Sequence, residues 1–246
     1  MKIIEAFAVK NKCYQAGAPL TPRGIMLHSV GCAQPSAAAF ARSFNQYQPG
    51  GVSVCVHAVA QADGTVYQLL PWEMRGWHCG GSANSTHIGV EMTEPSAGMT
   101  RSEAAEQIAG TYRTVVELFA ELCKQYELDP AQDGVIIGHA EGHRRGVASN
   151  HADPELLWRT YDMGYTMDGF RRDVAEAMKN GAREEALDMP RYDSVAEMPQ
   201  WARADAQRLI DRGALQGNTD GKLDVSEDML RTMIVCQRML DEQKET

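Results

Sequence analysis

Residues 138–158 read GHAEGHRRGVASNHADPELLW, and they follow the apolar run GVII at 134–137. A short apolar run of this kind is typical of a buried strand. The stretch after it places three histidines and two carboxylates within fifteen positions, namely His139, Glu141, His143, His151 and Asp153. A strand that ends in a histidine and opens into a loop with glycine and small polar residues can hold a metal ligand rigidly. We therefore expect the functional site at the end of this strand.

A second apolar run has the same ending. Residues 24–27 (GIML) form a short apolar segment directly before His28. Imidazole and carboxylate ligands together suit zinc better than calcium or magnesium, which prefer shells made of oxygen atoms. A single histidine at a strand end is more often structural, but here two such strands end in one. The sequence therefore predicts a zinc site that contains His28 and His139.

Four separated motifs carry a family resemblance. They are GIMLHSVG at 24–31, VCVHAVAQADGTVYQLLPWEMRGWHCGG at 54–81, HIGVEMTEP at 87–95 and GHAEGHRRGVASNHADPELLW at 138–158. In order and spacing these segments resemble zinc-dependent N-acetylmuramoyl-L-alanine amidases, a family that includes phage endolysins, bacterial autolysins and peptidoglycan recognition proteins. The resemblance extends over residues 20–180. It implies a peptidoglycan substrate and hydrolysis of the amide between N-acetylmuramic acid and L-alanine.

The third zinc ligand has three candidates. Asp153 matches the acidic or thiol ligand of the family, so we choose His28, His139 and Asp153, with a water in the open fourth position of a catalytic site. His143 lies four residues after His139, which would suit a helix, but the flanking glycines argue against a helix here. His151 lies two positions before Asp153 and is the alternative ligand.

Hydrolysis of an amide also needs a proton carrier beside the zinc-activated water. Glu91 lies between apolar residues of an expected strand and matches the catalytic glutamate of some relatives, while Glu94 is the competing carboxylate. At position 151 many relatives carry lysine, whose charge would stabilise the tetrahedral oxyanion. His151 can do this when protonated or as an N–H donor. We therefore predict that Glu91 and His151 are the catalytic residues.

Three aromatic residues are expected to line the substrate cleft rather than to bind zinc: His57, Trp77 and His78. Trp77 can either stack on a sugar or belong to the core. A different hypothesis makes Cys32 or Cys79 the nucleophile of a cysteine peptidase, with His57 or His78 as its base. A reactive thiolate needs a positioned base and usually a lowered pKa, and only proximity in the sequence favours this hypothesis. The zinc amidase is the better interpretation.

Composition excludes several other classes. The net charge of −9 argues against a nucleic acid partner, which usually needs a basic surface. No run of eighteen apolar residues spans a membrane, and the N-terminal segment is too polar for a signal peptide. The six cysteines include no CxxC pair, so we expect reduced thiols. These features suggest a phage or prophage endolysin that is made in the cytoplasm and acts on the cell wall after release. The alternative is a recognition protein that binds peptidoglycan without cutting it.

The fold class expected is α/β, a mixed central β-sheet with helices packed on it, plus a small helical module at the C-terminus. Residues 1–23 carry little pattern, and a loop is expected at their end, at Gly17-Ala18-Pro19 and Thr21-Pro22. The expected strands lie at 24–28, 53–60, 65–70, 88–93 and 134–137, with an Asp-Gly turn joining the second to the third. The expected helices of this part lie at 35–44, 100–126 and 170–179, the second opening with a Thr100–Glu103 capping box.

The expected domains are an amidase domain at 1–180, a polar linker at 181–191 and a small helical module at 192–246. Two helices are expected in the module, at 198–213 and from Ser226 onward. The segment YDSVAEMPQWARADAQRLIDRGALQG at 192–217 resembles one S-layer-homology repeat, which implies binding to a cell-wall polymer. A helical hairpin that packs on the amidase domain or on a second subunit explains the pattern equally well. Asn218, Asp220 and Asp224 alternate like calcium ligands but are expected to be turn residues.

Overall fold

The inner strands of the sheet are almost wholly apolar, as expected for parallel strands that are covered on both faces. The computed structural model describes residues 1–46, 54–188 and 190–242. Its six-stranded sheet has the order β1-β4-β3-β5-β2-β6, and only the β3–β4 pair is antiparallel. The strands are β1 Lys2–Glu5, β2 Gly24–Ser29, β3 Ala58–Ala60, β4 Thr65–Gln68, β5 His87–Met92 and β6 Ile136–Gly138. The predicted mixed α/β fold is confirmed.

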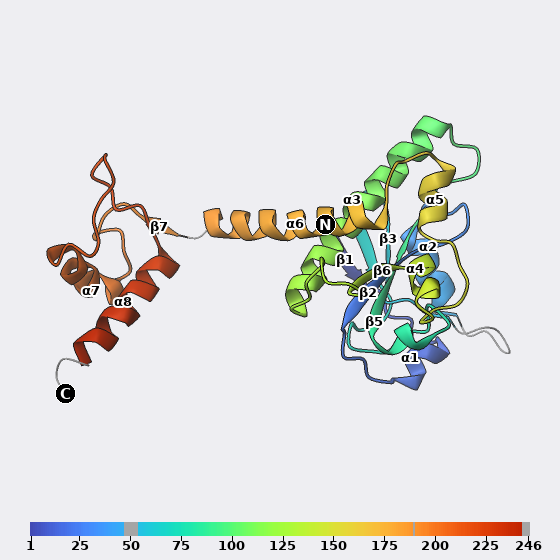
Figure 1. The fold of residues 1–246 in the computed structure, drawn as a ribbon, viewed down its shortest axis with the longest axis horizontal. Helices are drawn as coiled ribbons and strands as arrows, with labels where there is room; N and C mark the ends of the chain where they lie inside the picture. The colour runs from blue at the N-terminus through green and yellow to red at the C-terminus, as the bar shows by residue number, and fades with distance from the viewer. Residues whose placement is uncertain (47–53, 189, 243–246) are drawn as a thin grey trace. The chain divides into compact units, whose positions relative to one another are not determined.

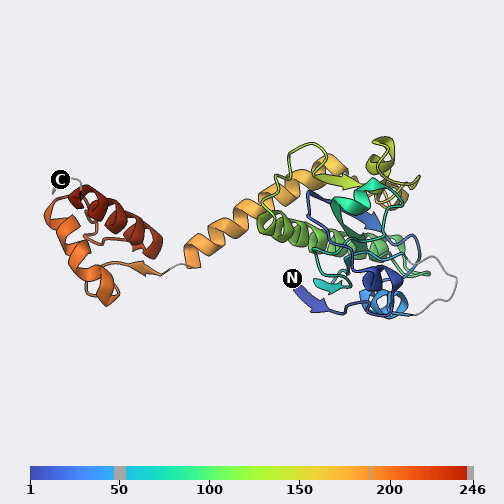
Figure 2. The same cartoon turned by 90° about the horizontal axis from the view of Figure 1, so that it is seen from below.

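Helices cover both faces of this sheet (Figure 1). They are α1 Lys12–Ala16, α2 Ala37–Phe44, the 3-10 helix η1 Ser82–Ser85, α3 Arg101–Gln125, α4 His139–Arg144, α5 Glu155–Thr160 and α6 Met167–Asp188. Figure 2 shows the long helix α3 and the short helix α2 on opposite sides of the strands. The helix expected at 100–126 is confirmed, including the capping box between Thr100 and Glu103.

Alternation along the strands decides which side chains meet which helices. Ile25 and Leu27 of β2 pack in the cluster that contains α3, whereas Met26 packs on the opposite face against η1. Because side chains alternate between faces, His28 points to the same face as Met26. On β5, Val90 belongs to the α3 cluster, so its neighbour Glu91 faces the side of His28. One face of the sheet is therefore apolar and packs against α3, and the other face carries the polar side chains of His28 and Glu91.

The loop expected at residues 17–22 is confirmed, because no helix or strand covers this segment. The residues before it, which carry little pattern in the sequence, are not irregular. They contain β1, which adds to the edge of the sheet beside β4, and α1. The side chain of Asn11 accepts a hydrogen bond from the backbone of Cys13 at the start of α1, and Gly17 ends the helix with φ of 57°. These two residues are ordinary helix start and stop signals, and they were the available evidence for α1. The four residues of β1 gave no comparable signal, because a pairing partner sixty residues away defines the strand.

The polar linker expected at 181–191 is helical as far as Asp188, because α6 continues through it. The segment GAREEALD is rich in strong helix formers, and its charge does not prevent a helix. By its internal packing the chain divides into two compact units, Met1–Asn180 and Gly181–Thr246. Among the described residues, no helix has the length and apolar character needed to cross a membrane.

The second unit contains β7 Arg191–Tyr192, α7 Gln200–Asp211, β8 Val225–Ser226 and α8 Glu227–Glu242. Strands β7 and β8 pair antiparallel, and an apolar cluster that includes Met198, Leu209 and Leu230 joins α7 to α8. Both predicted helices are present. Asn218 accepts hydrogen bonds from the backbone of Asp220 and Lys222, and this supports its prediction as a turn residue.

The capping box of α3 gives a testable prediction for stability. Replacing Thr100 by alanine removes the acceptor for the backbone N–H of Glu103, so the free energy of unfolding should fall by about 1 kcal/mol. Denaturant titration of the full chain measures this change. Ser102→Ala is the matched control: the residue is exposed inside the first turn, and the higher helix propensity of alanine should raise stability slightly. Equal effects of the two substitutions would contradict the capping assignment.

Candidate metal centre

Parallel strand ends bring the two predicted zinc-binding histidines together. β2 pairs in parallel with β6, with Leu27 opposite Gly138, so the residues that follow these two positions leave the sheet at the same edge. Those residues are His28, next to last in β2, and His139, the first residue of α4. Asp153 approaches the same point from the loop before α5. The predicted ligands therefore come from three separate segments of the chain.

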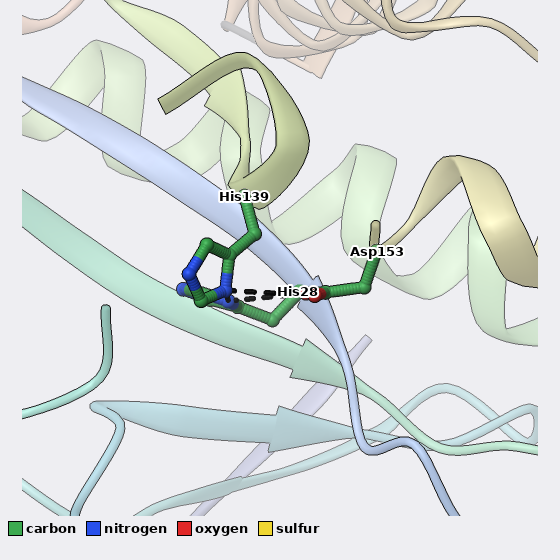
Figure 3. Close-up of side chains that lie close together, drawn as sticks. All are labelled: His28, His139 and Asp153. Carbon is green, nitrogen blue, oxygen red and sulfur yellow. Dashed lines mark hydrogen bonds and ion pairs between the residues drawn. The ribbon is translucent and has the colours of Figure 1, made fainter. Parts of the chain in front are cut away.

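The three side chains converge on one point (Figure 3). The two Nδ1 atoms of His28 and His139 are 3.0 Å apart. The carboxylate oxygens of Asp153 lie 3.3 Å from Nδ1 of His28 and 3.5 Å from Nδ1 of His139. Both imidazoles are buried, with 1% and 4% of their surface exposed. Two ring nitrogens and a carboxylate held this close would repel one another unless a cation, either a proton or a metal, lies between them.

The protonation states also fit a metal. Burial lowers the pKa of His28, which favours the neutral ring. Burial alone would raise the pKa of Asp153, but the hydrogen bonds and charges of His139 and His28 hold that pKa well below its usual range. A metal needs a neutral imidazole with a free lone pair and an ionised carboxylate. The donor set of two nitrogens and one carboxylate fits a transition metal such as zinc and leaves coordination positions open.

A cavity of about 730 Å³ opens onto these residues. Its wall contains the three converging side chains and further polar groups, among them His78, Glu91, Glu94, Ser149 and His151. Val54, Leu156 and Tyr161 add apolar surface, and the first two are about half exposed. A second cavity of about 580 Å³, lined by Glu141, Trp158 and Tyr165 among others, contains none of the three converging residues. The first cavity is therefore the candidate active site.

Comparison with known proteins agrees with this geometry. The sequence matches the model of the N-acetylmuramoyl-L-alanine amidase family over residues 18–156, more than half of the chain. The chain belongs to this amidase family. No curated protein matches the amidase sequence significantly.

Solved structures share the fold of the amidase. The catalytic domain of XlyA is 23% identical with a TM-score of 0.53, and the match covers 71% of this chain and 99% of that one. The Staphylococcus aureus hydrolase AmiA, solved in complex with its ligand, is 20% identical with a TM-score of 0.56, over 74% and 86% of the two chains. A mutant endolysin from Bacillus subtilis is 22% identical with a TM-score of 0.50, over 71% and 99%.

Glu91 of the amidase has the environment of a proton carrier. It lies opposite His28 in the register of β5 with β2 and lines the cavity. Its Oε2 atom is buried and has no hydrogen-bond partner among the residues that the structure describes. Burial raises the pKa of Glu91 well above its usual range, and the nearby carboxylates of Asp153 and Glu94 raise it further. Glu94 also lines the cavity, but its Oε1 atom accepts a hydrogen bond of 2.8 Å from the backbone of Gly31. Of the two carboxylates, Glu91 is the one with an oxygen left unpartnered in the interior.

His151 and His143 differ in position. The ring of His151 stacks on that of His139, with centroids 4.5 Å apart and an angle of 22° between the planes, and it lines the cavity. Its nitrogens are not part of the converging group, in which Asp153 supplies the third ligand atom. His143 is exposed and does not line the cavity.

The expectation that no helix forms around His143 is wrong, because α4 spans His139–Arg144. The glycine at position 142 serves packing rather than a turn. A Cβ atom there would lie 2.8 Å from Cε of Met26, so only glycine lets α4 approach β2 this closely. Glu141, in the first turn, accepts a hydrogen bond from the backbone of Gly138 and pairs with Arg171 of α6. These contacts override the weak helix propensity of glycine.

Of the three residues expected to line the cleft, His78 does and His57 does not. His57 is 0% exposed, and its two ring nitrogens contact the backbone of Met74 and Gly89. Burial lowers the pKa of His57 to about 4, so its ring is a neutral structural group. Trp77 packs against the apolar cluster around α1 and α2 and lies outside the cavity wall, which favours its core alternative. The hairpin pattern alone could not distinguish a buried histidine from one at the surface.

The cysteines do not suit a nucleophilic role. Cys79 is buried, and its thiol donates to Oδ1 of Asn84 at 3.2 Å. Burial raises its pKa, whereas a catalytic thiol needs a lowered one. The pKa of the exposed Cys32 is also raised, by partial burial and by Glu94 and Glu91. The cysteine peptidase hypothesis therefore loses its chemical basis.

Metal content tests the ligand set. Asp153→Ala should lose bound zinc after loading and desalting, because the converging group loses one of its three ligands. His143→Ala is the matched control and should retain zinc, since this side chain points to solvent four residues after a ligand. Elemental analysis per mole of protein measures both, with circular dichroism to confirm folding. Loss of zinc in His143→Ala alone would refute the ligand assignment.

Proposed function

We propose that this protein is a zinc-dependent N-acetylmuramoyl-L-alanine amidase that cuts peptidoglycan and uses Glu91 as its proton carrier. The observation that carries the proposal is the position of Glu91, half-buried with one buried oxygen unpartnered among the described residues, in the cavity onto which His28, His139 and Asp153 converge. Membership of the amidase family supports the substrate class, an amide between N-acetylmuramic acid and L-alanine. The metal and the roles of the individual residues are the proposed part.

His28, His139 and Asp153 would hold the zinc ion. A zinc ion in such a site polarises the carbonyl of the substrate and lowers the pKa of water to about 7. The fold supplies the ligands in suitable protonation states, because burial favours a neutral His28 and the imidazoles favour an ionised Asp153.

Glu91 would move the proton. In the hydrolysis a water oxygen bonds to the carbonyl carbon, the C–N bond breaks and the amine of L-alanine must gain a proton. Glu91 takes a proton from the attacking water and returns it to this amine. A group with a raised pKa performs both transfers near neutral pH, because it binds the proton firmly enough to accept it and releases it to a more basic amine. The unpartnered Oε2 atom needs no other hydrogen bond to be broken first.

His151 would support the oxyanion that forms on the carbonyl oxygen. It lines the cavity, and its stacking on His139 keeps the ring beside the metal ligands. An N–H donor or an imidazolium at this position interacts most strongly with the negative charge that develops in the transition state. The exposed side chain of His151 can also adjust to the bound substrate.

The alternative proposal is a recognition protein that binds peptidoglycan without cutting it. In such proteins a zinc ligand is typically lost, whereas here all three ligand positions are filled. A purely binding protein also has no need for a carboxyl group kept unpaired in the interior, since burial of Glu91 costs free energy. Both features favour the enzyme.

We also propose an endolysin role in the lysis of bacteria by a phage or prophage, in which the protein is made in the cytoplasm and reaches the wall at lysis. An endolysin from Bacillus subtilis shares the fold of the first unit, which supports this context. The second unit is compact with its own apolar core and is the candidate for binding a cell-wall polymer or a second subunit.

The activity itself is tested on purified cell walls. Turbidity should fall and free amino groups of L-alanine should appear, and removal of zinc with a chelator should abolish both effects. Treatment with a thiol alkylating agent should spare the activity, because the cysteines have no role in it. The opposite pattern, with sensitivity to alkylation and indifference to the chelator, would contradict the proposed mechanism.

If Glu91 carries the proton, its substitution should lower kcat without any loss of bound zinc. Glu91→Gln keeps the size of the side chain but cannot exchange a proton, so kcat should fall by about 10²-fold or more while zinc stays bound. Glu94→Gln is the matched control, and its effect on kcat should be much smaller because the backbone of Gly31 already occupies that carboxylate. Near-normal turnover in Glu91→Gln would assign the proton transfer to another group.

The role of His151 predicts a loss in catalysis without a loss of metal. His151→Ala removes the donor to the oxyanion and should lower kcat by about 10²-fold, the usual effect of losing one such donor. His143→Ala again serves as the control and should leave kcat unchanged. Elemental analysis of the same preparations decides the role, since a loss of zinc in His151→Ala would make this residue a ligand.

A further inference from the structure

The two metal-ligating imidazoles each have a second ring nitrogen, and both of these nitrogens are engaged inside the protein. Nε2 of His28 lies 2.9 Å from Nδ1 of His78. Nε2 of His139 lies 3.2 Å from Oγ of Ser149. We propose that His78 and Ser149 are positioning residues that fix both ligands as the tautomer with a proton on Nε2 and a bare Nδ1. The inference deepens the proposed zinc site and rests on it.

The direction of the first hydrogen-bond chain follows from its far end. Nε2 of His78 lies 3.1 Å from the backbone oxygen of His87, which can only accept, so this nitrogen carries the proton. A neutral imidazole carries a single proton, so with that proton on Nε2 the Nδ1 atom of His78 is an acceptor. The proton between His78 and His28 then belongs to Nε2 of His28. The lone pair of His28 is left on Nδ1, which points to the converging group.

The direction of the second hydrogen-bond chain, from His139 through Ser149, also follows from its far end. Oγ of Ser149 lies 3.0 Å from the backbone oxygen of Cys79, so the serine hydroxyl donates its only proton to that oxygen. Its remaining hydrogen-bonding capacity is as an acceptor, which requires the proton on Nε2 of His139. Nδ1 of His139 is then bare and faces Nδ1 of His28 at 3.0 Å. Both chains end on backbone oxygens, whose acceptor character cannot change.

One short segment anchors both chains. His78 supplies the acceptor for His28, and the carbonyl of the next residue, Cys79, orients Ser149. The side chain of Asn84, in η1, holds this segment because its Oδ1 atom accepts from the backbone N–H groups of His78 and Cys79 at 2.9 and 3.0 Å. The two ligands therefore share a common support, although His28 lies in β2 and His139 begins α4.

Close packing keeps the ring of His78 in place. A Cβ atom at Gly89 would lie 2.4 Å from Cγ of this ring, so the ring rests directly on the backbone of β5. A Cβ atom at Gly76 would lie 3.0 Å from Cδ2 on another side. The imidazole cannot turn away from His28 without losing its packing against these two glycines. Groups that hold a metal-bound histidine in this way typically change metal affinity by 10- to 100-fold when they are removed.

Zinc affinity of the full chain tests the proposal without any measurement of activity. Ser149→Ala removes the acceptor for His139 and should weaken zinc binding by about 10- to 100-fold in competition with a chromophoric chelator. Ser149→Thr keeps the hydroxyl and should bind zinc like the wild type. His78→Leu should weaken binding to a similar extent through His28, and His78→Gln, which retains an acceptor oxygen, should recover part of the loss.

The tautomers provide an independent readout. In ¹⁵N–¹H spectra of the metal-free full chain, His28 and His139 should both carry a proton on Nε2, and Ser149→Ala should change the Nε2 signal of His139 only. A bare Nε2 in either wild-type ring, or zinc affinity unchanged in both Ser149→Ala and His78→Leu, would overturn the inference. A wild-type protein that binds no zinc would instead overturn the proposed function, and the tautomers would then decide the inference by themselves.

Discussion

The parallel pairing of β2 with its two neighbours is the constraint on which the site depends. Pairing with β6 brings His28 and His139 to one edge of the sheet, and pairing with β5 puts Glu91 beside His28. Because successive side chains alternate between faces, the same residues that fill the α3 cluster force these polar groups to the opposite face. A shift of one residue in either register would bury a histidine or the glutamate in the apolar cluster. The hydrophobic core thus fixes the positions of these polar groups.

Neighbouring groups shift the pKa values of two carboxylates of one cavity in opposite directions. Burial alone would raise both, but the two imidazoles beside Asp153 hold its pKa low, so it stays ionised. For Glu91, burial raises the pKa and the nearby carboxylates of Asp153 and Glu94 raise it further. Separation of pKa values by environment is the usual way in which an active site assigns one carboxylate to a permanent charge and another to proton transfer. Here the first suits a metal ligand and the second a proton carrier.

Rigidity at the site comes from backbone as much as from side chains. Gly142 lets α4 lie against Met26, and Gly89 lets the ring of His78 rest on β5. Asn84 ties the backbone of His78 and Cys79 to η1. The small glycine residues allow this close approach. The hydrogen bonds of His78 and Ser149 to backbone oxygens have a fixed direction, because such an oxygen can only accept. His151 and Leu156, which are exposed, also line the cavity.

The sequence by itself determined the α/β fold, the hairpin and the long helix α3, because apolar runs, the Asp-Gly turn and the capping box are local signals. The amidase family was indicated by the resemblance of four motifs, and the family match confirms it. It also selected His28, His139, Asp153 and Glu91 as a group. Only the tertiary structure could show that β1 pairs with β4, that α4 is a helix around Gly142, and that His57 is buried. Ser149 had no local signal at all, since a serine in a loop acquires its role only from the imidazole of His139 and the carbonyl of Cys79. Local patterns record what a residue prefers, whereas burial and hydrogen-bond partners depend on segments that are distant in the chain.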